Sequence, residues 1–365
     1  MAGKSRLALP GQAVLVLQGG GALGAYQVGV YEALHEAGLE PDWAIGTSIG
    51  AINAAVIAGN RREDRLPRLL ELWQRFEQGD AGALDHGKVF GDFAALLWGI
   101  PGFFSPRLPA WGGLKAKVGL DSASYYSTAP LRETLARLVD LELLGRQMRL
   151  TVGAVNVTSG EMRYFDSRDA ALGLDEVMAS GALPPAFPAI RVDGEAYWDG
   201  GLYSNTPLEA VLGDKPRRDA VIFAVNVWQA TGHEPDSLWQ VLARQKDIQY
   251  ASRADSHIAH QKQIHRLRHL VRELTKDLSA QKQEQYRELA SWGCATTMHV
   301  VRLCAPALED EDFTKDLDFS AASIHFRREA GRVDTRRMLE RAPWQAPVDP
   351  LEGVIVHELS ARTGG

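Results

Sequence analysis

The hydrophobic pattern begins with a short apolar run at 13–17, "AVLVL", which is followed by glycines. Such a run is typical of a strand that is buried on both faces of a sheet. Apolar positions then recur with helical spacing over 24–37, and Gly38 ends the predicted helix. A second strand is predicted at 43–48 and a helix of small residues at 49–59. Short connections between these elements predict parallel strands joined by right-handed crossovers.

The pattern continues with alternating element types as far as residue 228. Helices are predicted at 61–78 and 128–139, where a serine or threonine precedes a proline in the first turn of the second helix. Two β-hairpins are predicted at 149–165 and 188–203, each turning at a glycine, and a further buried strand at 219–228. The fold class expected from this order is a three-layer α/β/α domain with a mainly parallel central sheet.

The remainder of the chain has a different character. Residues 236–291 are helical in pattern and rich in lysine and arginine, 297–303 predict a late strand, and 318–342 predict a pair of helices. Acidic residues dilute the positive charge of 236–291, which favours a solvated helical hairpin packed on the core over a surface for anionic lipid or a partner. We therefore expect a mostly helical C-terminal extension over 229–365.

Composition narrows the classes of protein. Of the 365 residues, 45% are hydrophobic, which is the composition of an ordinary globular protein. The formal net charge of −6 gives no general attraction for nucleic acid. No segment has eighteen uninterrupted apolar residues, and cleavage of a signal peptide would fall inside the first predicted strand. We therefore expect a cytoplasmic protein. Its two cysteines, Cys294 and Cys304, match neither a zinc site nor a disulfide framework, so buried free thiols and no metal are expected.

A glycine pattern, Gly19-x-Gly21-x-x-Gly24, follows the first predicted strand and is compatible with a dinucleotide-binding turn. That fingerprint also needs an acidic residue at the C-terminal end of the second strand, where it would hold the ribose hydroxyls. Glu40 and Asp42 instead precede the second strand and so lie at its opposite end. The placement of these acidic residues argues against a bound nucleotide.

The second glycine pattern, Gly46-x-Ser48-x-Gly50, is that of a nucleophile elbow, in which a serine lies on a tight strand-to-helix turn. Parallel neighbouring strands would bring the glycines of 19–21 beside Ser48 at the same edge of the sheet. Consecutive glycines can direct several backbone N–H groups to one point and so stabilise an oxyanion. The first glycine loop then serves the serine and requires no cofactor.

A serine nucleophile needs a base, and Asp199 is the strongest candidate. It ends a hairpin strand and precedes Gly200 and Gly201, an irregular turn where a carboxylate can be partly desolvated and so become a better proton acceptor. A conventional triad stays open as an alternative, because three histidines follow Asp199 in the chain: His299, His325 and His357.

Together these motifs resemble those of the patatin-like phospholipase family. The resemblance covers 13–228, after an N-terminal segment of 1–12, and is carried by "GGGALGAYQVGV", "GTSIGAINAA", "ASGALPPAFPAI" and "DGG". It implies a serine acyl hydrolase with a Ser–Asp dyad and no cofactor. By that resemblance Ser48 is the nucleophile, Asp199 is the base, and the oxyanion hole is formed by Gly19, Gly20 and Gly21. Leu23 stands where family members often have arginine or lysine.

One segment lacks both periodicities and is rich in aromatic residues. Residues 88–114 contain Phe90, Phe93, Trp98, Phe103, Phe104 and Trp111. Two interpretations have equal weight: a lid or acyl-chain wall that meets a lipid aggregate, or a buried cap over the core.

The function expected from the sequence is hydrolysis of lipid carboxylic esters, above all phospholipids, with peripheral membrane contact. Neutral lipids or thioesters are alternative substrates for the same dyad. A dinucleotide-binding protein and a lipid-binding scaffold without turnover are the alternatives from other classes. Nothing in the sequence predicts the oligomeric state.

Overall fold

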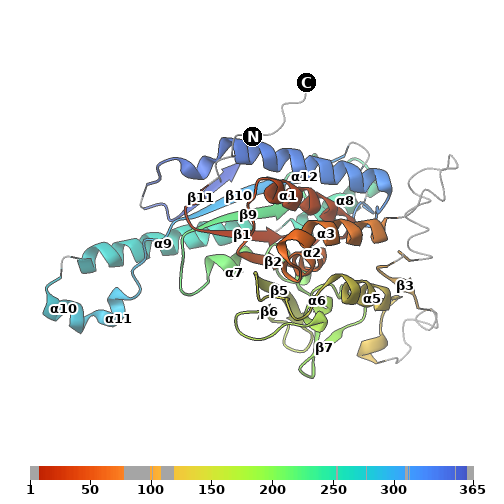
Figure 1. Ribbon diagram of the computed structural model, residues 1–365, viewed down its shortest axis with the longest axis horizontal. Helices are drawn as coiled ribbons and strands as arrows, with labels where there is room; N and C mark the ends of the chain where they lie inside the picture. Colours follow the sequence, from red (N-terminus) through yellow and green to blue (C-terminus); the bar gives the residue numbers. More distant parts are fainter. Residues whose placement is uncertain are drawn as a thin grey trace.

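The structure is a computed structural model that describes residues 8–77, 99–100, 102–107, 119–251, 254–276, 278–308, 311, 313–349 and 351–359. Its strands are β1 (Gln12–Leu17), β2 (Trp43–Gly46), β3 (Ser105–Pro106), β4 (Tyr126–Ser127), β5 (Arg149–Asn156), β6 (Met162–Asp166), β7 (Ile190–Val192), β8 (Glu195–Asp199), β9 (Ala220–Asn226), β10 (Met298–Cys304) and β11 (Val354–Glu358). Within the described residues, nine of them form one central sheet, while β3 and β4 pair with each other (Figure 1).

The central sheet is mainly parallel, as the sequence predicts. Its order is β11-β10-β9-β1-β2-β5-β8-β7, with β6 also paired to β5. The pairs from β11 through to β5 are parallel, whereas β6, β7 and β8 join antiparallel. The two predicted hairpins are confirmed as β5–β6 and β7–β8.

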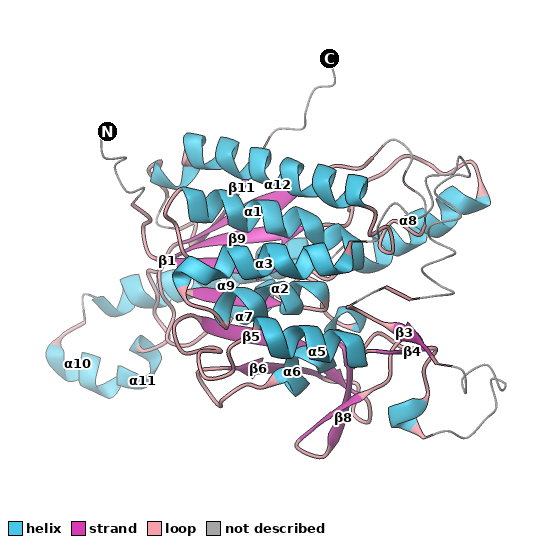
Figure 2. Ribbon diagram, turned by 45° about the vertical axis from the view of Figure 1, so that its right-hand side comes forward, coloured by secondary structure: helices cyan, strands magenta, loops and turns pink. Residues whose placement is uncertain are grey.

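Helices cover both faces of this sheet (Figure 2). They are α1 (Ala25–Glu36), α2 (Ile49–Ala58), α3 (Arg62–Phe76), α5 (Ala129–Leu138), α6 (Leu174–Ser180), α7 (Leu208–Leu212), α8 (Leu238–Tyr250), α9 (Ala254–Lys276), α10 (Ala280–Gln285), α11 (Arg287–Ala290) and α12 (Ala321–Arg341). Alternate side chains of β1 enter two separate cores: Leu15 and Leu17 pack with α1, α2, α3 and α12, and Val14 and Val16 with α7 and α9. The predicted three-layer α/β/α architecture is confirmed.

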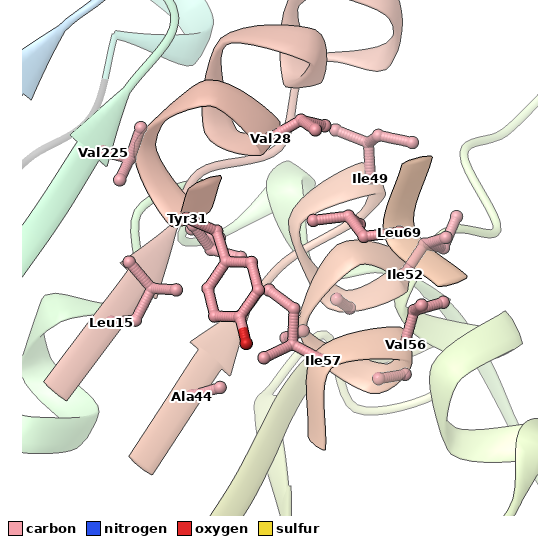
Figure 3. Packing of buried hydrophobic residues seen from close by; sticks show 14 of the residues in the cluster. Leu15, Val28, Tyr31, Ala44, Ile49, Ile52, Val56, Ile57, Leu69 and Val225 are labelled. Carbon is pink, nitrogen blue, oxygen red and sulfur yellow. The ribbon is translucent and has the colours of Figure 1, made fainter. Parts of the chain in front are cut away.

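The larger core shows why the small-residue helix is required (Figure 3). Tyr31 of α1 and Ile57 of α2 lie over Leu15 and Ala44 of the two central strands, and all four side chains are buried. Alanine and glycine elsewhere in α2 let this helix lie close to β1 and β2, which fixes the turn that precedes it.

The C-terminal region is mostly helical, and it also completes the sheet. Its β10 and β11 extend the parallel strands beyond β9, and α12 packs along α1. The predicted strand at 297–303 is confirmed as β10. The helical pair predicted at 318–342 is a single helix, α12. Helices α9–α11 form an arm that projects from the body of the molecule (Figure 1).

The described part of 88–114 is packed into the fold. Ile100, Phe103 and Phe104 are buried, and the Phe103 ring lies 5.0 Å from that of Phe76 on α3. Phe90, Phe93, Trp98 and Trp111 lie outside the described residues.

The two cysteines are free thiols, but Cys304 is exposed and Cys294 only partly buried, so the expectation that both are buried was wrong.

Candidate active site

Strand register places the two glycine motifs side by side. Leu17 of β1 pairs with Gly46 of β2 in a parallel ladder. Gly19 and Ser48 each follow two residues later and therefore lie at the same level beyond the C-terminal edge of the sheet. A Cβ atom added to Gly19 would lie only 3.0 Å from Cβ of Ser48. Any larger residue at position 19 would therefore crowd the serine.

The same register brings the predicted base to the serine from the other side. Gly46 pairs with Val152 of β5, and two residues further along β5 Ala154 pairs with Asp199 of the antiparallel β8. Asp199 thus ends its strand level with Ser48. The two residues are 151 positions apart in the chain, and β5 alone lies between their strands.

Ser48 occupies a strained turn between β2 and α2. Its φ of 55° and ψ of −126° are unusual for a residue with a side chain, and such strain is concentrated at functional sites. The backbones around it approach closely: a Cβ on Gly46 would lie 2.3 Å from the Gly50 carbonyl, and one on Gly50 would lie 2.2 Å from the Leu17 carbonyl oxygen. The Ser48 N–H donates to both oxygens of Ser180 at 3.1 Å, which anchors the turn.

Asp199 is a buried carboxylate with two donors. Its exposed fraction is 2%, and the Gly201 N–H donates to its Oδ1 at 2.7 Å. Burial raises the pKa of Asp199 to about 7, while hydrogen bonds from the Ser48 hydroxyl and the Gly201 N–H stabilise the ionised form and partly oppose that rise. Gly200 is held close to β5, since a Cβ there would lie 2.3 Å from the Gly153 carbonyl oxygen. A carboxylate with this pKa is suited to exchange a proton near neutral pH.

The glycine loop is fixed from several directions. The Gly19 N–H donates to the Asn205 carbonyl at 3.1 Å, and its carbonyl accepts from Trp228 Nε1 at 2.7 Å and Asn205 Nδ2 at 3.1 Å. Gly19 thus positions the loop. In the part of the chain that the structure describes, no protein acceptor is found for the N–H groups of Gly20 and Gly21, which lie beside the same cavity as Ser48.

Sequence reasoning missed the residues that support this loop. Gln18 accepts from the Val227 N–H at 2.5 Å and donates to the Tyr250 carbonyl at 3.1 Å. Asn205 also donates to that carbonyl, at 2.9 Å, so the end of α8 is bound directly to the glycine loop. Two of these residues lie near the motifs in the sequence, because Gln18 directly precedes Gly19 and Asn205 closely follows "DGG"; Tyr250 is 202 positions from Ser48 and lies near neither motif.

Tyr250 also faces the site. Its ring lies 5.1 Å from that of Trp228, and burial together with the charges of Asp199 and Asp316 raises the pKa of its hydroxyl to about 12. The phenol is therefore protonated at neutral pH, and it lines the same cavity as Asp199.

Ser48 and Asp199 open onto an apolar cavity of about 240 Å³. Its walls come from segments far apart in the sequence: Phe103 and Phe104 precede α5, and Leu317 and Phe319 precede α12. The remaining apolar lining residues are Ile49, Ile52, Tyr126, Leu183, Ala186, Phe187, Trp228 and Tyr250. A cavity of this composition suits a hydrocarbon chain with its polar end at Ser48.

Glu40 and Asp42, the acidic residues before the second strand, form contacts away from the glycine loop. Glu40 accepts from Arg65 Nη1 at 2.7 Å, and Asp42 accepts from the Ala13 N–H at 2.8 Å. Both lie at the N-terminal edge of the sheet, opposite the glycine loop. The structure therefore supports the argument from the sequence against a dinucleotide.

The histidines of the alternative triad are also distant. His299 is level with Ala13 through β9, six residues of extended strand before Gly19, or roughly 20 Å. Its Nδ1 lies 2.9 Å from Nε2 of His357. His325 lies on α12, outside the residues that line the cavity.

The described residues contain neither a candidate metal site nor a candidate membrane-spanning helix. No group of three or more histidine, cysteine, aspartate or glutamate side chains there is arranged to hold a metal ion. No helix in those parts of the chain combines the length and apolar character needed to cross a bilayer.

A three-layer α/β fold with a serine on a strained strand-to-helix turn is typical of serine hydrolases. Within that class, the chain belongs to the patatin-like phospholipase family. The sequence profile described as patatin-like phospholipase matches residues 15–212, more than half of the chain, and a second profile described as patatin phospholipase matches 248–351.

Individual relatives match over short stretches. The lysophospholipase nte1 of Aspergillus terreus is 61% identical over 44 residues, 12% of this chain. The triacylglycerol lipase ptl3 of Schizosaccharomyces pombe is 44% identical over 62 residues, 17% of this chain. The matches span 3% and 13% of the lengths of those two proteins.

Two solved structures show a distant likeness. VipD from Legionella pneumophila has a TM-score of 0.40 at 17% identity, covering 91% of this chain and 67% of that one. The type III effector ExoU has a TM-score of 0.34 at 18% identity, covering 91% and 53%.

Proposed function

We propose that this chain is a serine acyl hydrolase that cleaves carboxylic esters of lipids, with phospholipids as the main class of substrate. The observation that supports it most strongly is the contact between the Ser48 hydroxyl and the buried carboxylate of Asp199 at the mouth of an apolar cavity. Hydroxyl, base and acyl pocket are the three requirements of this chemistry.

In the acylation step, Ser48 Oγ attacks the acyl carbonyl carbon and Asp199 takes the hydroxyl proton. The negative charge that develops on the carbonyl oxygen is stabilised by the N–H groups of Gly20 and Gly21, for which the described residues supply no acceptor. Each such donor is worth roughly 2.7–4 kcal/mol by comparison with other serine hydrolases. The tetrahedral intermediate then collapses, the C–O bond to the alcohol breaks, and Asp199 returns the proton to the departing oxygen.

Deacylation repeats these steps with water. Asp199, ionised again, takes a proton from a water molecule that attacks the Ser48 ester, and the proton then passes to Ser48 Oγ as the fatty acid leaves. The same carboxylate serves both half-reactions, and a pKa of about 7 makes it an effective acceptor and donor in turn.

The proposed substrate class follows from the cavity and the family. The apolar walls accommodate an acyl chain, and the profiles that match are those of phospholipases. Two relatives are named as a lysophospholipase and a triacylglycerol lipase, so lysophospholipids and neutral lipids are the substrates to compare with diacyl phospholipids.

The test is release of fatty acid from phosphatidylcholine, lysophosphatidylcholine, triacylglycerol and an acyl thioester, each presented with detergent. The wild-type chain should release fatty acid from at least one phospholipid, and Ser48→Ala and Asp199→Asn should each lose at least about a hundredfold in rate. Turnover of the neutral lipid or the thioester alone would contradict the phospholipid assignment. Equal turnover by the wild type and Ser48→Ala would contradict the serine mechanism.

A further inference from the structure

Helix α8 has an inverted distribution of polar and apolar side chains. Ser237 caps its first turn by accepting from the Gln240 N–H, and the helix ends at Tyr250 in the wall of the cavity. The exposed positions between them are occupied only by uncharged residues: Leu238, Trp239, Gln240, Val241, Leu242, Gln245, Ile248 and Gln249. A surface helix normally shows the opposite arrangement, with charged residues toward water.

The three charged residues of α8 instead contact the protein. Arg244 donates to the carbonyls of Gln229 and Ala230 at 3.0 and 2.7 Å. Lys246 pairs with Asp316 at 2.7 Å, and Asp247 accepts from Lys315 at 2.8 Å. The charges thus hold α8 in place, and its apolar side chains are left outside. Leu238 is 82% exposed and Ile248 is 65% exposed.

Further exposed apolar residues lie at the rim of the site. Leu202 and Tyr203 are both exposed and directly follow the cavity-lining Gly201. Asn205, two residues beyond Tyr203, donates to the carbonyl of Tyr250 at the end of α8. The C-terminal end of α8 therefore lies next to the catalytic cavity, and the apolar surface of the helix extends away from it. The arm α9–α11 lies on the opposite side of the molecule (Figure 2).

We infer that the outer face of α8, with Leu202 and Tyr203, is the surface by which this protein docks on a lipid layer, so that its cavity meets the lipid. This inference rests on the proposed function, because a lipid ester must reach Ser48 from a lipid aggregate. A lipid surface is favoured over a protein partner by the absence of exposed charge on α8, which matches a hydrocarbon boundary and gives no ion pair to a partner. Docking is therefore governed by apolar burial and depends little on salt.

The experiment measures partition of the full-length chain onto phosphatidylcholine vesicles, with Ser48→Ala in every protein so that no lipid is consumed. Leu238→Glu combined with Ile248→Glu should lower the partition coefficient at least about tenfold, because two exposed aliphatic groups are replaced by charges. Raising NaCl from about 0.1 to 0.5 M should change it less than about twofold. Leu274→Glu is the control for surface charge in general: it places one glutamate on the arm, at a site 75% exposed.

Activity measurements separate docking from catalysis. With Ser48 intact, the α8 double variant should hydrolyse a soluble short-chain ester within about twofold of the wild-type rate, and vesicle lipid at least about tenfold more slowly. Unchanged partition of the double variant, or an equal loss of partition in the Leu274→Glu control, would overturn the inference. So would a wild-type dimer that becomes a monomer in the double variant, as measured by sedimentation, because a second copy of the chain would then occupy this surface. The partition arm needs no turnover, so it can succeed even if the proposed function fails.

Discussion

Asp199 shows how a single residue can link function to a cost in stability. Its burial opposes ionisation, yet the proposed reaction requires the ionised form as the base. Two hydrogen bonds, from Ser48 and Gly201, compensate only part of the desolvation, and the pKa remains raised at about 7. We expect consequences for the pH dependence of both activity and stability.

The first prediction concerns activity. Because Asp199 must be ionised to accept the Ser48 proton, kcat/KM should rise about tenfold per pH unit below pH 7 and level off above about pH 8. The measurement is a pH profile on a soluble ester, which avoids effects of pH on lipid packing. A profile that is flat down to about pH 5 would show that a group with a much lower pKa is the base.

The second prediction concerns stability. The pKa of Asp199 lies above its ordinary value of 3.8, so between the two values the folded state holds a proton that the unfolded state has lost. Its contribution to the free energy of unfolding therefore falls as pH rises from about 4 to 7. Asp199→Asn cannot ionise, and its gain in stability over the wild type should be larger at pH 8 than at pH 4, as measured by urea denaturation.

The matched control for this comparison is Asp169→Asn, since the Asp169 side chain is 69% exposed. That variant should follow the wild type at both pH values. An Asp199→Asn variant that is less stable than the wild type at pH 8 would contradict the account of the buried carboxylate.

At the scale of residues, the juxtaposition of Ser48 and Asp199 in the candidate site could be predicted from sequence, because its two motifs report local geometry. Ser48 and Asp199 each lie beside glycines that the backbone requires, and that pattern is visible in a short window. The positions of Asn205, Trp228 and Tyr250 could not be predicted, because they act through long-range hydrogen bonds that leave no local pattern. For the same reason, the engagement of the Gly19 N–H by Asn205 became apparent only in the fold.

At the scale of elements, strand and helix types were predictable from periodicity, whereas their partners were not. Helix α12 illustrates the difference: its pattern indicated helix, but its contact with α1 rests on two glycines. A Cβ on Gly29 would lie 1.7 Å from the Arg328 carbonyl oxygen, and one on Gly331 would lie 2.1 Å from that of Tyr26. The two backbones approach too closely for any larger residue.

The third prediction uses this contact. In a solvated helix, Gly→Ala stabilises by up to about 1 kcal/mol. Gly331→Ala should instead lower the free energy of unfolding by about 1–3 kcal/mol, because α12 must move away from α1. Chemical denaturation of the full chain measures the difference. A variant as stable as the wild type would show that the helices do not pack at this distance.

At the scale of the whole molecule, the C-terminal region is part of the same structure as Ser48. It supplies β10 and β11 to the sheet, α12 to one face, and Tyr250, Leu317 and Phe319 to the cavity. Sequence analysis predicted most of the helices of this region, but not its role in the site, because the strand order of the sheet depends on pairings between β9 and β10 more than seventy residues apart.

The fourth prediction follows from that integration. A chain that ends at residue 228 leaves β9 as an edge strand and exposes the face of α1 that α12 covers. We expect it to aggregate or to lack a cooperative unfolding transition, as judged by size-exclusion chromatography and thermal melting. A soluble monomer that melts cooperatively and hydrolyses a soluble ester would show that residues 1–228 fold independently.

The central claim, an activated Ser48 beside Asp199, is tested most directly by labelling the full-length protein with a fluorophosphonate and mapping the modified peptide. The account predicts a single adduct on Ser48, with a labelling rate at least about tenfold lower in Asp199→Asn and unchanged within about twofold in Asp169→Asn. Absence of label on Ser48 in the presence of detergent, or an equal rate in Asp199→Asn and the wild type, would contradict it.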